Sequence, residues 1–303
     1  MTTRTDPTGE TFGSLIDRAH GFLAAGKDYR RSSVVIFGVP LDATTSYRPG
    51  AYLGPRRIRE ASMSIEEYSW DLDHDLLETT FYDLGDAALP LGNLTACLGV
   101  IRDVAARLLG DGHIPFMLGG EHLVTLPAIE AIAAKHPQLA VLHFDAHADL
   151  RDTYLGERLS HATVMRRVAE ALSPKSVAQF GIRSGAKEEL GFAKANTLLF
   201  RDGLVASVKA ALREFRGRPI YVTFDIDAFD PAYAPGTGTP EPGGFAPREV
   251  FDSLYALRES HRRGEVRVVG LDLVEVAPAL DPSERTAVLA AKLIREAILC
   301  FGR

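Results

Sequence analysis

The stretch VLHFDAHADL, residues 141–150, begins as an apolar strand and then alternates acidic and imidazole side chains. Side chains of a strand alternate between its two faces, so Asp145, His147 and Asp149 point to one side if the extended conformation persists. Two carboxylates and an imidazole packed together repel one another or shift their pKa values, whereas a divalent cation turns the same crowding into attraction. The stretch therefore predicts a metal site at the end of a buried strand.

Seven further β-rich runs surround this one, and helical patterns separate most of them. The eight runs are residues 33–39, 79–85, 114–120, 139–145, 176–182, 196–200, 218–227 and 266–277. Helical periodicity is clear at 93–110, 123–136, 204–216, 247–262 and, after Pro282, at 282–301. This alternation predicts an α/β fold whose mainly parallel sheet is covered by helices on both faces. Since no linker or repeat divides the chain, we expect one domain over 1–303, with residues 1–30 as an arm or an added helix.

Composition and charge narrow the class of partner. The chain has 303 residues, a net charge of −6 and no cationic run, which argues against nucleic acid and anionic membranes as partners. The N-terminus lacks the apolar core of a signal peptide, and no later segment is long and apolar enough to span a bilayer. The only two cysteines, Cys97 and Cys300, form no CxxC pair. We therefore expect a soluble protein of the reducing cytoplasm.

Two other strand ends carry similar side chains. Asp225 and Asp227 in YVTFDIDAFDP (221–231) repeat the spacing of two, and His122 follows the glycines of LGGEHLV (118–124). In a parallel α/β sheet, ligands collect beyond the carboxyl ends of the strands, so these ends can meet in one crevice. Together they provide six candidate ligands: His122, Asp145, His147, Asp149, Asp225 and Asp227.

The chemistry of this donor set points to a pair of metal ions. Imidazole and carboxylate without sulfur favour a borderline-hard ion such as Mn²⁺, with Zn²⁺, Fe²⁺ and Co²⁺ as competitors. Six side chains exceed the needs of one ion, and four aspartates balance the charge of two divalent cations. Paired ions about 3.5–4 Å apart make hydroxide available near neutral pH, so hydrolysis is implied. His143, which shares the register, is expected to pack or to support a ligand.

At this point the chain resembles the ureohydrolases, the arginase and agmatinase family. Five motifs carry the resemblance: GGEH (119–122), DAHAD (145–149), SHAT (160–163), DIDAFDPAYAPGTGTPEPGG (225–244) and GLDLVEVAP (270–278). SYRPGAYLGPRRIREAS (46–62) and GDAALPLGN (85–93) resemble the bacterial agmatinase branch. The resemblance implies a three-layer αβα sandwich around a mainly parallel eight-stranded sheet, the arginase-like fold.

The resemblance also implies roles for individual residues. Two Mn²⁺ ions per subunit would share Asp145 and Asp225, one ion with His122 and Asp149 and the other with His147 and Asp227. A hydroxide between the ions would attack the guanidinium carbon and release urea and an amine. Glu275 would accept hydrogen bonds from the planar guanidinium, and His161 would carry protons to the leaving amine.

The loop RDTYLGERLS, residues 151–160, is expected to recognise the end of the substrate away from the guanidinium. It lacks the Asn with which arginases recognise the amino acid end of arginine. Asp152, Tyr154 and Glu157 are expected to face the ammonium end of agmatine, whereas Arg151 and Arg158 would equally favour a carboxylate such as that of guanidinobutyrate. Because the branch motifs match across the chain, we expect agmatine hydrolysis to putrescine and urea, a step of polyamine biosynthesis.

Three residues differ from those most common at their positions in the family motifs: Glu121, Ala148 and Thr223. None is a predicted ligand, but they leave open how hydrogen bonds orient His122 and Asp149. Two rival interpretations remain, a single-metal polyamine deacetylase on a related scaffold and a non-catalytic protein that binds polyamines in an acidic cleft. Family members usually form homo-oligomers, often hexamers, and we expect the same here.

Overall fold

A computed structural model describes residues 12–17, 21–26, 28–90 and 92–303. Within these residues nine strands form one sheet in the order β1-β5-β2-β6-β11-β10-β7-β8-β9, and every neighbouring pair is parallel except β1 and β5. The strands are β1 (Ile16–Asp17), β2 (Val34–Val39), β5 (Phe81–Ala87), β6 (Ile114–Gly119), β7 (Ala140–Phe144), β8 (Val177–Phe180), β9 (Leu198–Phe200), β10 (Pro219–Asp225) and β11 (Arg267–Val274). A separate hairpin pairs β3 (Tyr68–Ser69) with β4 (His74–Asp75).

The eight predicted strands all occur, as β2 and β5 to β11. The sheet has one strand more than predicted, the two-residue β1, which pairs antiparallel with β5 at the sheet edge. Two residues are too short to show the alternation by which a strand is recognised from sequence. The prediction for residues 1–30 concerns a segment in which 1–11, 18–20 and 27 lie outside the described residues, and it stays a prediction.

Eight helices surround the sheet in the described part of the chain. They are α2 (Gly54–Ser62), α3 (Leu94–Gly110), α4 (Thr125–Lys135), α5 (Val164–Ala171), α6 (Lys187–Asn196), α7 (Leu204–Glu214), α8 (Pro247–Arg262) and α9 (Arg285–Phe301). All five predicted helices are present, and α9 begins three residues after Pro282. The short helices α2, α5 and α6 were not predicted. None of the described helices is long and apolar enough to cross a membrane.

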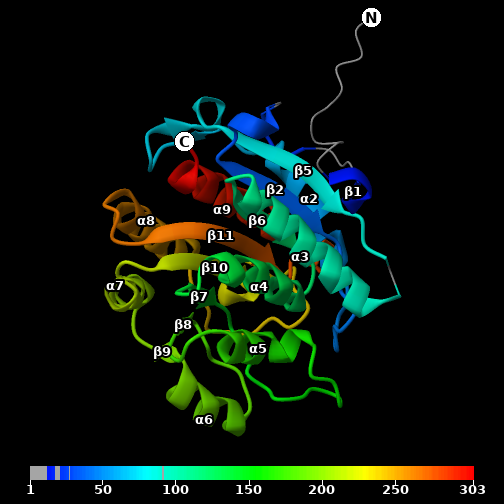
Figure 1. The fold of residues 1–303 in the computed structure, drawn as a ribbon, viewed down its shortest axis with the longest axis vertical. Helices are drawn as coiled ribbons and strands as arrows, with labels where there is room; N and C mark the ends of the chain where they lie inside the picture. Colours follow the sequence, from blue (N-terminus) through cyan, green and yellow to red (C-terminus); the bar gives the residue numbers. More distant parts are fainter. Residues whose placement is uncertain (1–11, 18–20, 27, 91) are drawn as a thin grey trace, which may run out of the picture.

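The alternation of strand residues separates the core into two layers. In β2, Val34 and Ile36 pack in one cluster with residues of α2, α7, α8 and α9, whereas Val35 and Phe37 pack in the other with residues of α3, α4 and α5. Figure 1 shows α3, α4 and α5 in front of the sheet and α9 behind it. Because each central strand buries both faces, its sequence is mainly apolar. The molecule is therefore the predicted three-layer αβα sandwich.

The order of the central strands determines where the polar ends of the strands meet. The strands β6, β11, β10 and β7 are consecutive in the sheet and parallel, so their carboxyl ends share one edge. His122 follows β6, Glu275 follows β11, Asp225 ends β10 and Asp145 follows β7. Segments separated by up to about half the chain are thereby brought together at the place where parallel α/β sheets bind ligands.

Candidate metal centre and substrate pocket

The two acidic motifs turn away from their strands at the first aspartate. The extended conformation ends at Phe144. The side-chain alternation of the strand therefore does not reach Asp149, contrary to the expectation from the sequence. Instead Asp145 Oδ1 accepts a hydrogen bond from the His147 backbone N–H at 2.6 Å, and Asp225 Oδ1 accepts one from the Asp227 N–H at 2.8 Å. Such Asx turns fold the next ligand back toward the first. The side chains converge through turns rather than through strand periodicity.

Asp149 completes the first turn in an unusual backbone conformation. Its φ is +53°, in the left-handed region that a residue with a Cβ rarely adopts. Backbone strain of this kind costs about 1–3 kcal/mol and persists where the surroundings impose it, often at functional sites. The strain brings the Asp149 carboxylate to 3.2 Å from the His122 Nδ1 atom.

His122 lies at the centre of the first group of predicted ligands. Its Nδ1 atom is 3.1 Å from Asp145 Oδ2 and 3.3 Å from Asp225 Oδ2, in addition to its approach to Asp149. The other ring nitrogen, Nε2, lies 3.0 Å from Thr223 Oγ1. Thr223, which differs from the residue most common at this position in the family, therefore orients the imidazole so that Nδ1 faces the carboxylates.

His147 forms the second group with two aspartates. Its Nδ1 atom is 3.0 Å from Asp227 Oδ2 and 3.7 Å from Asp145 Oδ1. Two clusters of potential ligand atoms result, one with His122, His143, Asp145 and Asp149 and one with Asp145, His147 and Asp227. Asp145 belongs to both clusters. All six predicted ligands therefore come together, and one carboxylate joins the two halves.

The pKa values of Asp145, Asp149 and Asp225 reflect the crowding of the carboxylates. Burial, followed by repulsion from Asp227 and Asp145, raises the pKa of Asp225 well above its ordinary value. Burial and then repulsion from Asp145 raise the pKa of Asp149 to about 7. Burial also opposes the charge of Asp145, but hydrogen bonds from the three histidines His122, His143 and His147 hold its pKa well below the ordinary value. Carboxylates in such mutual repulsion need positive charge nearby.

The residues fit a pair of metal ions on evidence of this structure. The His122 Nδ1 atom is buried and has no hydrogen-bond partner of good geometry among the described residues, although three carboxylate oxygens lie within 3.3 Å. An unpartnered buried polar atom is costly, and a cation between the nitrogen and the oxygens would satisfy all of them. The donor set of imidazole nitrogen and carboxylate oxygen suits a divalent cation of the first transition row.

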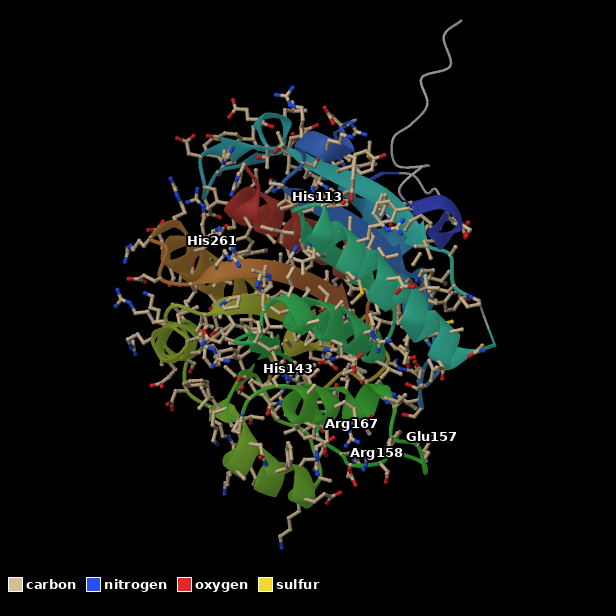
Figure 2. The ribbon with its side chains drawn as sticks, in the orientation of Figure 1. His113, His143, Glu157, Arg158, Arg167 and His261 are labelled. Atoms are coloured by element: carbon tan, nitrogen blue, oxygen red, sulfur yellow. The ribbon has the colours of Figure 1, made fainter. Side chains whose placement is uncertain are left out.

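His143 lies on β7 (Figure 2), next to the predicted ligand Asp145, but both of its ring nitrogens are occupied. Nε2 is 2.8 Å from Asp145 Oδ2, and Nδ1 is 3.1 Å from Gln179 Nε2. Its burial is complete. We interpret His143 as the residue that orients Asp145, as expected from the sequence, because a ligand needs a nitrogen free to face the ion.

A cavity of about 240 Å³ opens above the clustered ligands. Four predicted ligands line it, together with both residues assigned a role in catalysis and part of the 151–160 loop: His122, His147, Asp149, Asp225, His161, Glu275, Arg151 and Tyr154. Polar side chains that the sequence did not single out complete the lining, among them Ser46, Ser184 and Glu189. The cavity joins the metal cluster to a polar channel of a size suited to a small substrate.

Glu275 stands where the sequence placed it, but not in a strand. β11 ends at Val274, and Glu275 has a φ of +65°. Its Oε1 atom accepts a hydrogen bond from the His122 backbone N–H at 2.7 Å, which ties it to the metal cluster. Burial and then repulsion from Glu121 raise the pKa of Glu275 to about 8. The strained, half-buried carboxylate lines the cavity, where a cation would stabilise its charge.

His161 lies across the cavity at the start of the segment before α5. Its ring packs edge to face on Tyr154, with centroids 5.4 Å apart, and burial lowers its pKa to about 4. Thr44 Oγ1 accepts a hydrogen bond from the His161 backbone N–H at 3.0 Å, and Ser46 Oγ is 3.4 Å from Nε2. The imidazole is therefore neutral and held by the loop that follows β2, with a lone pair available to accept a proton.

The structure divides the predicted specificity loop. Tyr154 and Arg151 line the cavity, whereas Asp152 and Glu157 are exposed and are not part of its described lining. The Asp152 carboxylate instead accepts hydrogen bonds from Arg167 at 2.8 Å and Arg158 at 3.2 Å. Figure 2 shows Glu157 and Arg158 along the outer loop before α5 and Arg167 close by. Of the three side chains proposed to face an ammonium group, only Tyr154 lies near the substrate space.

Sequence reasoning missed the loop of residues 40–53, which contributes Thr45 and Ser46 to the cavity and Thr44 to its support. A signal was present, since the run TTS (44–46) comes shortly after a buried strand, where parallel sheets place functional groups. β2 is the next strand beyond β6 in the sheet, so its carboxyl end adjoins that of β6. Without the strand order, this hydroxyl-rich turn is indistinguishable from an ordinary loop.

Comparison with known proteins establishes the family of this chain. The arginase family model matches residues 32–300, so the chain belongs to the arginase family. An agmatinase of Bacillus anthracis is 48% identical over 279 residues, covering 92% of this chain and 95% of that protein. A mitochondrial guanidino acid hydrolase of Homo sapiens is 41% identical over 278 residues, covering 87% of this chain and 76% of that protein. The family fold and the His/Asp cluster together support a binuclear metal site in this chain.

A solved structure gives the same relationship. The crystal structure of agmatine ureohydrolase of Thermoplasma volcanium matches with a TM-score of 0.82 and 32% identity, covering 94% of this chain and 95% of that one. The arginase-like fold expected from the sequence is therefore confirmed. The chain spans nearly the whole length of both bacterial and archaeal relatives.

Proposed function

We propose that this chain is a binuclear manganese hydrolase that cleaves agmatine to putrescine and urea, a step of polyamine biosynthesis. The observation that carries the proposal is the cluster of two imidazoles and four carboxylates beneath a cavity that Glu275 and His161 also line. The similarity to an agmatinase over 92% of the chain supports the substrate. No other group in the cavity could supply a nucleophile of comparable strength near neutral pH among the residues described.

The six ligands divide naturally between two ions. We assign His122 and Asp149 to one ion and His147 and Asp227 to the other, with Asp145 and Asp225 shared. When bound, two divalent ions supply a hydroxide nucleophile near neutral pH and stabilise the negative charge that develops during attack. Mn²⁺ is the proposed metal because nitrogen and oxygen donors without sulfur suit a borderline-hard ion.

The remaining steps fall to the chain's own side chains. Glu275 would accept two hydrogen bonds from the guanidinium and hold its carbon above the metal cluster, since a carboxylate matches a planar guanidinium in two-point fashion. His161 would receive a proton at one ring nitrogen and donate it to the departing amine, because an amine leaves poorly without protonation.

A second candidate substrate follows from one specific observation. The charged side chain that the 151–160 loop contributes to the cavity is cationic: Arg151 lies over the Tyr154 ring, 5.2 Å from its centroid. An arginine there favours a carboxylate at the far end of the substrate, and a guanidino acid hydrolase is 41% identical. Glu189, 3.6 Å from Arg151, offsets that charge. We therefore place agmatine first and a guanidino acid such as guanidinobutyrate second.

The direct test is urea release from the Mn²⁺-loaded protein with agmatine, arginine and guanidinobutyrate side by side. A preference for agmatine that is abolished in Asp145→Asn supports the proposal. Urea from a guanidino acid alone keeps the chemistry and corrects the substrate. If no guanidine yields urea, the hydrolase proposal fails, and a metal-to-protein ratio near one would then favour the deacetylase interpretation over polyamine binding without turnover.

We also propose that the protein is a cytoplasmic homo-oligomer, a hexamer by resemblance to its family. Both cysteines, Cys97 and Cys300, are free and buried, which suits a reducing compartment. Light scattering on the purified protein measures the subunit number directly, and a monomer of 32.9 kDa would contradict the assembly.

A further inference from the structure

One charged side chain of the loop after β2 reaches across to another wall of the cavity. Arg48 belongs to the motif SYRPGAYLGP (46–55) and has no part in the chemistry described so far. Its Nε atom donates a hydrogen bond to the Gly238 carbonyl oxygen at 3.1 Å, and its Nη2 atom donates one to the Thr237 carbonyl oxygen at 2.9 Å. A guanidinium is always charged and can only donate, so the direction of both bonds is fixed.

The two carbonyl groups depend on this arginine. Thr237 and Gly238 are buried and lie in an irregular segment between β10 and α8, so neither a strand ladder nor a helix satisfies their oxygens. Among the residues that the structure describes, Arg48 is the only donor to either oxygen. Because a buried carbonyl without a partner is costly, Arg48 determines where this segment can lie.

The segment forms part of the cavity wall. Gly238 and Thr239 line the cavity, as do Thr45 and Ser46 on the loop that carries Arg48. Arg48 itself is absent from the described lining, so it joins the two walls without facing the substrate space. The loops approach each other so closely that a Cβ atom on Gly238 would lie 3.0 Å from the Arg48 carbonyl oxygen.

The same segment is also attached to the backbone beside Glu275. The N–H of Ala277, two residues after Glu275, donates to the Gly236 carbonyl oxygen at 2.8 Å. Gly50, with a φ of +138°, turns the loop of Arg48 toward the same place, since a Cβ atom on this glycine would lie 3.6 Å from the Ala277 Cβ atom. The loops after β2, β10 and β11 are therefore connected next to Glu275.

We infer that Arg48 is a positioning residue that fixes residues 236–239 against the loop after β2 and so sets the space in which the guanidinium end of the substrate binds. This inference rests on the proposed function. Neither hydrogen bond of Arg48 reaches a predicted metal ligand, so metal binding should not depend on it. Loss of a binding wall weakens ground state and transition state alike, which raises KM and leaves kcat nearly unchanged.

The first variant, Arg48→Met, keeps a long side chain and removes both donors. We expect KM for urea release from agmatine to rise about 10- to 100-fold, because a displacement of about 1 Å can cost that much. The kcat should change less than about threefold, and KM for guanidinobutyrate should rise by the same factor, since both substrates share the guanidinium end. Arg48→Lys keeps the charge but lacks the two-point fork, so its KM should lie between those of wild type and Arg48→Met.

Arg218 provides the matched control. It also donates to two consecutive backbone carbonyls, those of Gln138 and Leu139, both at 2.9 Å. It precedes β10, at the edge of the sheet opposite the metal cluster, and is absent from the described lining of the cavity. Arg218→Met should therefore lower the thermal unfolding temperature while its KM stays within about twofold of wild type.

Amide hydrogen exchange follows the segment itself, without reference to activity. The Gly236 N–H donates to Thr286 Oγ1 at 2.9 Å, and the Ala277 N–H donates to the Gly236 carbonyl oxygen. Both amides should exchange at least about tenfold faster in Arg48→Met than in Arg218→Met, because the segment has lost its attachment to the loop after β2. Metal content is measured on every variant, and Arg48→Lys replaces Arg48→Met if the latter does not fold.

The outcomes are distinct. If the wild-type protein releases no urea from any guanidine, the proposed function fails, and the exchange comparison alone decides whether Arg48 holds the segment. If the wild type is active but Arg48→Met keeps the wild-type KM, or if its amides exchange as slowly as those of Arg218→Met, the inference is wrong. A rise in KM for guanidinobutyrate alone also overturns it, because Arg48 would then bind the substrate carboxylate directly. Loss of metal from Arg48→Met contradicts it as well.

Discussion

Replacement of Glu275 by glutamine tests the assignment of the guanidinium-binding carboxylate. Glu275 Oε1 already accepts the His122 backbone N–H at 2.7 Å. In Glu275→Gln the one remaining carbonyl oxygen keeps that bond, so the amide N–H₂ faces the substrate. A guanidinium presents only donors to this position. The substitution therefore exchanges two charge-assisted hydrogen bonds for a contact between donors, while the backbone at His122 keeps its partner.

The size of the effect follows from these contacts. Hydrogen bonds to charged groups contribute about 1.5–3 kcal/mol each, so losing two of them costs about 3–5 kcal/mol after partial compensation. At about 1.4 kcal/mol per factor of ten, kcat/KM falls about 10²- to 10⁴-fold. The free energy of unfolding of the metal-free protein should instead rise in Glu275→Gln. Burial holds the pKa of Glu275 at about 8, which means that ionised Glu275 is unfavourable in the metal-free fold, and a neutral glutamine removes that cost.

The assay combines urea release with metal analysis and thermal unfolding. We expect a metal-to-protein ratio unchanged from wild type, a metal-free unfolding temperature at neutral pH equal to or above that of wild type, and the loss of kcat/KM just given. Glu296→Gln, a buried carboxylate outside the cavity, controls for the change of charge. A loss of less than tenfold in kcat/KM would refute the role of Glu275, and a loss accompanied by release of metal would place its effect on His122 instead.

Three further outcomes follow from the site. Asp227→Asn leaves His147 with Asp145 as its remaining carboxylate contact, so the metal-to-protein ratio should fall from about two to about one with loss of urea release; a ratio still near two would contradict the ligand assignment. Arg151→Gln should lower the turnover of guanidinobutyrate relative to agmatine at least tenfold, about 1.4 kcal/mol for a lost carboxylate contact, and an unchanged ratio would remove Arg151 from substrate selection. Burial and repulsion raise the pKa of Asp149 to about 7 in the metal-free protein, so at pH 6 its carboxyl is protonated and metal must displace that proton; loading should release protons at pH 6, and metal affinity should rise from pH 6 to pH 8, whereas affinity independent of pH would exclude this titration.

Much of the fold was readable from local pattern. Apolar runs and helical periodicity predict the eight strands and five helices, and each predicted ligand lies at or shortly after the end of an apolar run. The donor set also indicated a metal pair before any geometry was known, because four aspartates and two histidines at strand ends are too costly without cations. What the pattern could not show was short or irregular: the two-residue β1, the turn at Asp145 and the left-handed backbone of Glu275.

The amino-acid sequence by itself determined which segments become strands and which chemical groups their ends carry, since both depend on neighbours only a few residues apart. Only the tertiary structure decided which of those ends meet. The order β2-β6-β11-β10-β7 arises from the packing of helices on both faces and from crossovers between segments distant in the chain. That order brings Thr44 and Glu121 close to His161. The folded conformation of the 151–160 loop places Arg151, rather than Asp152, in the cavity lining. Contacts of this kind depend on three-dimensional adjacency, which no local periodicity encodes.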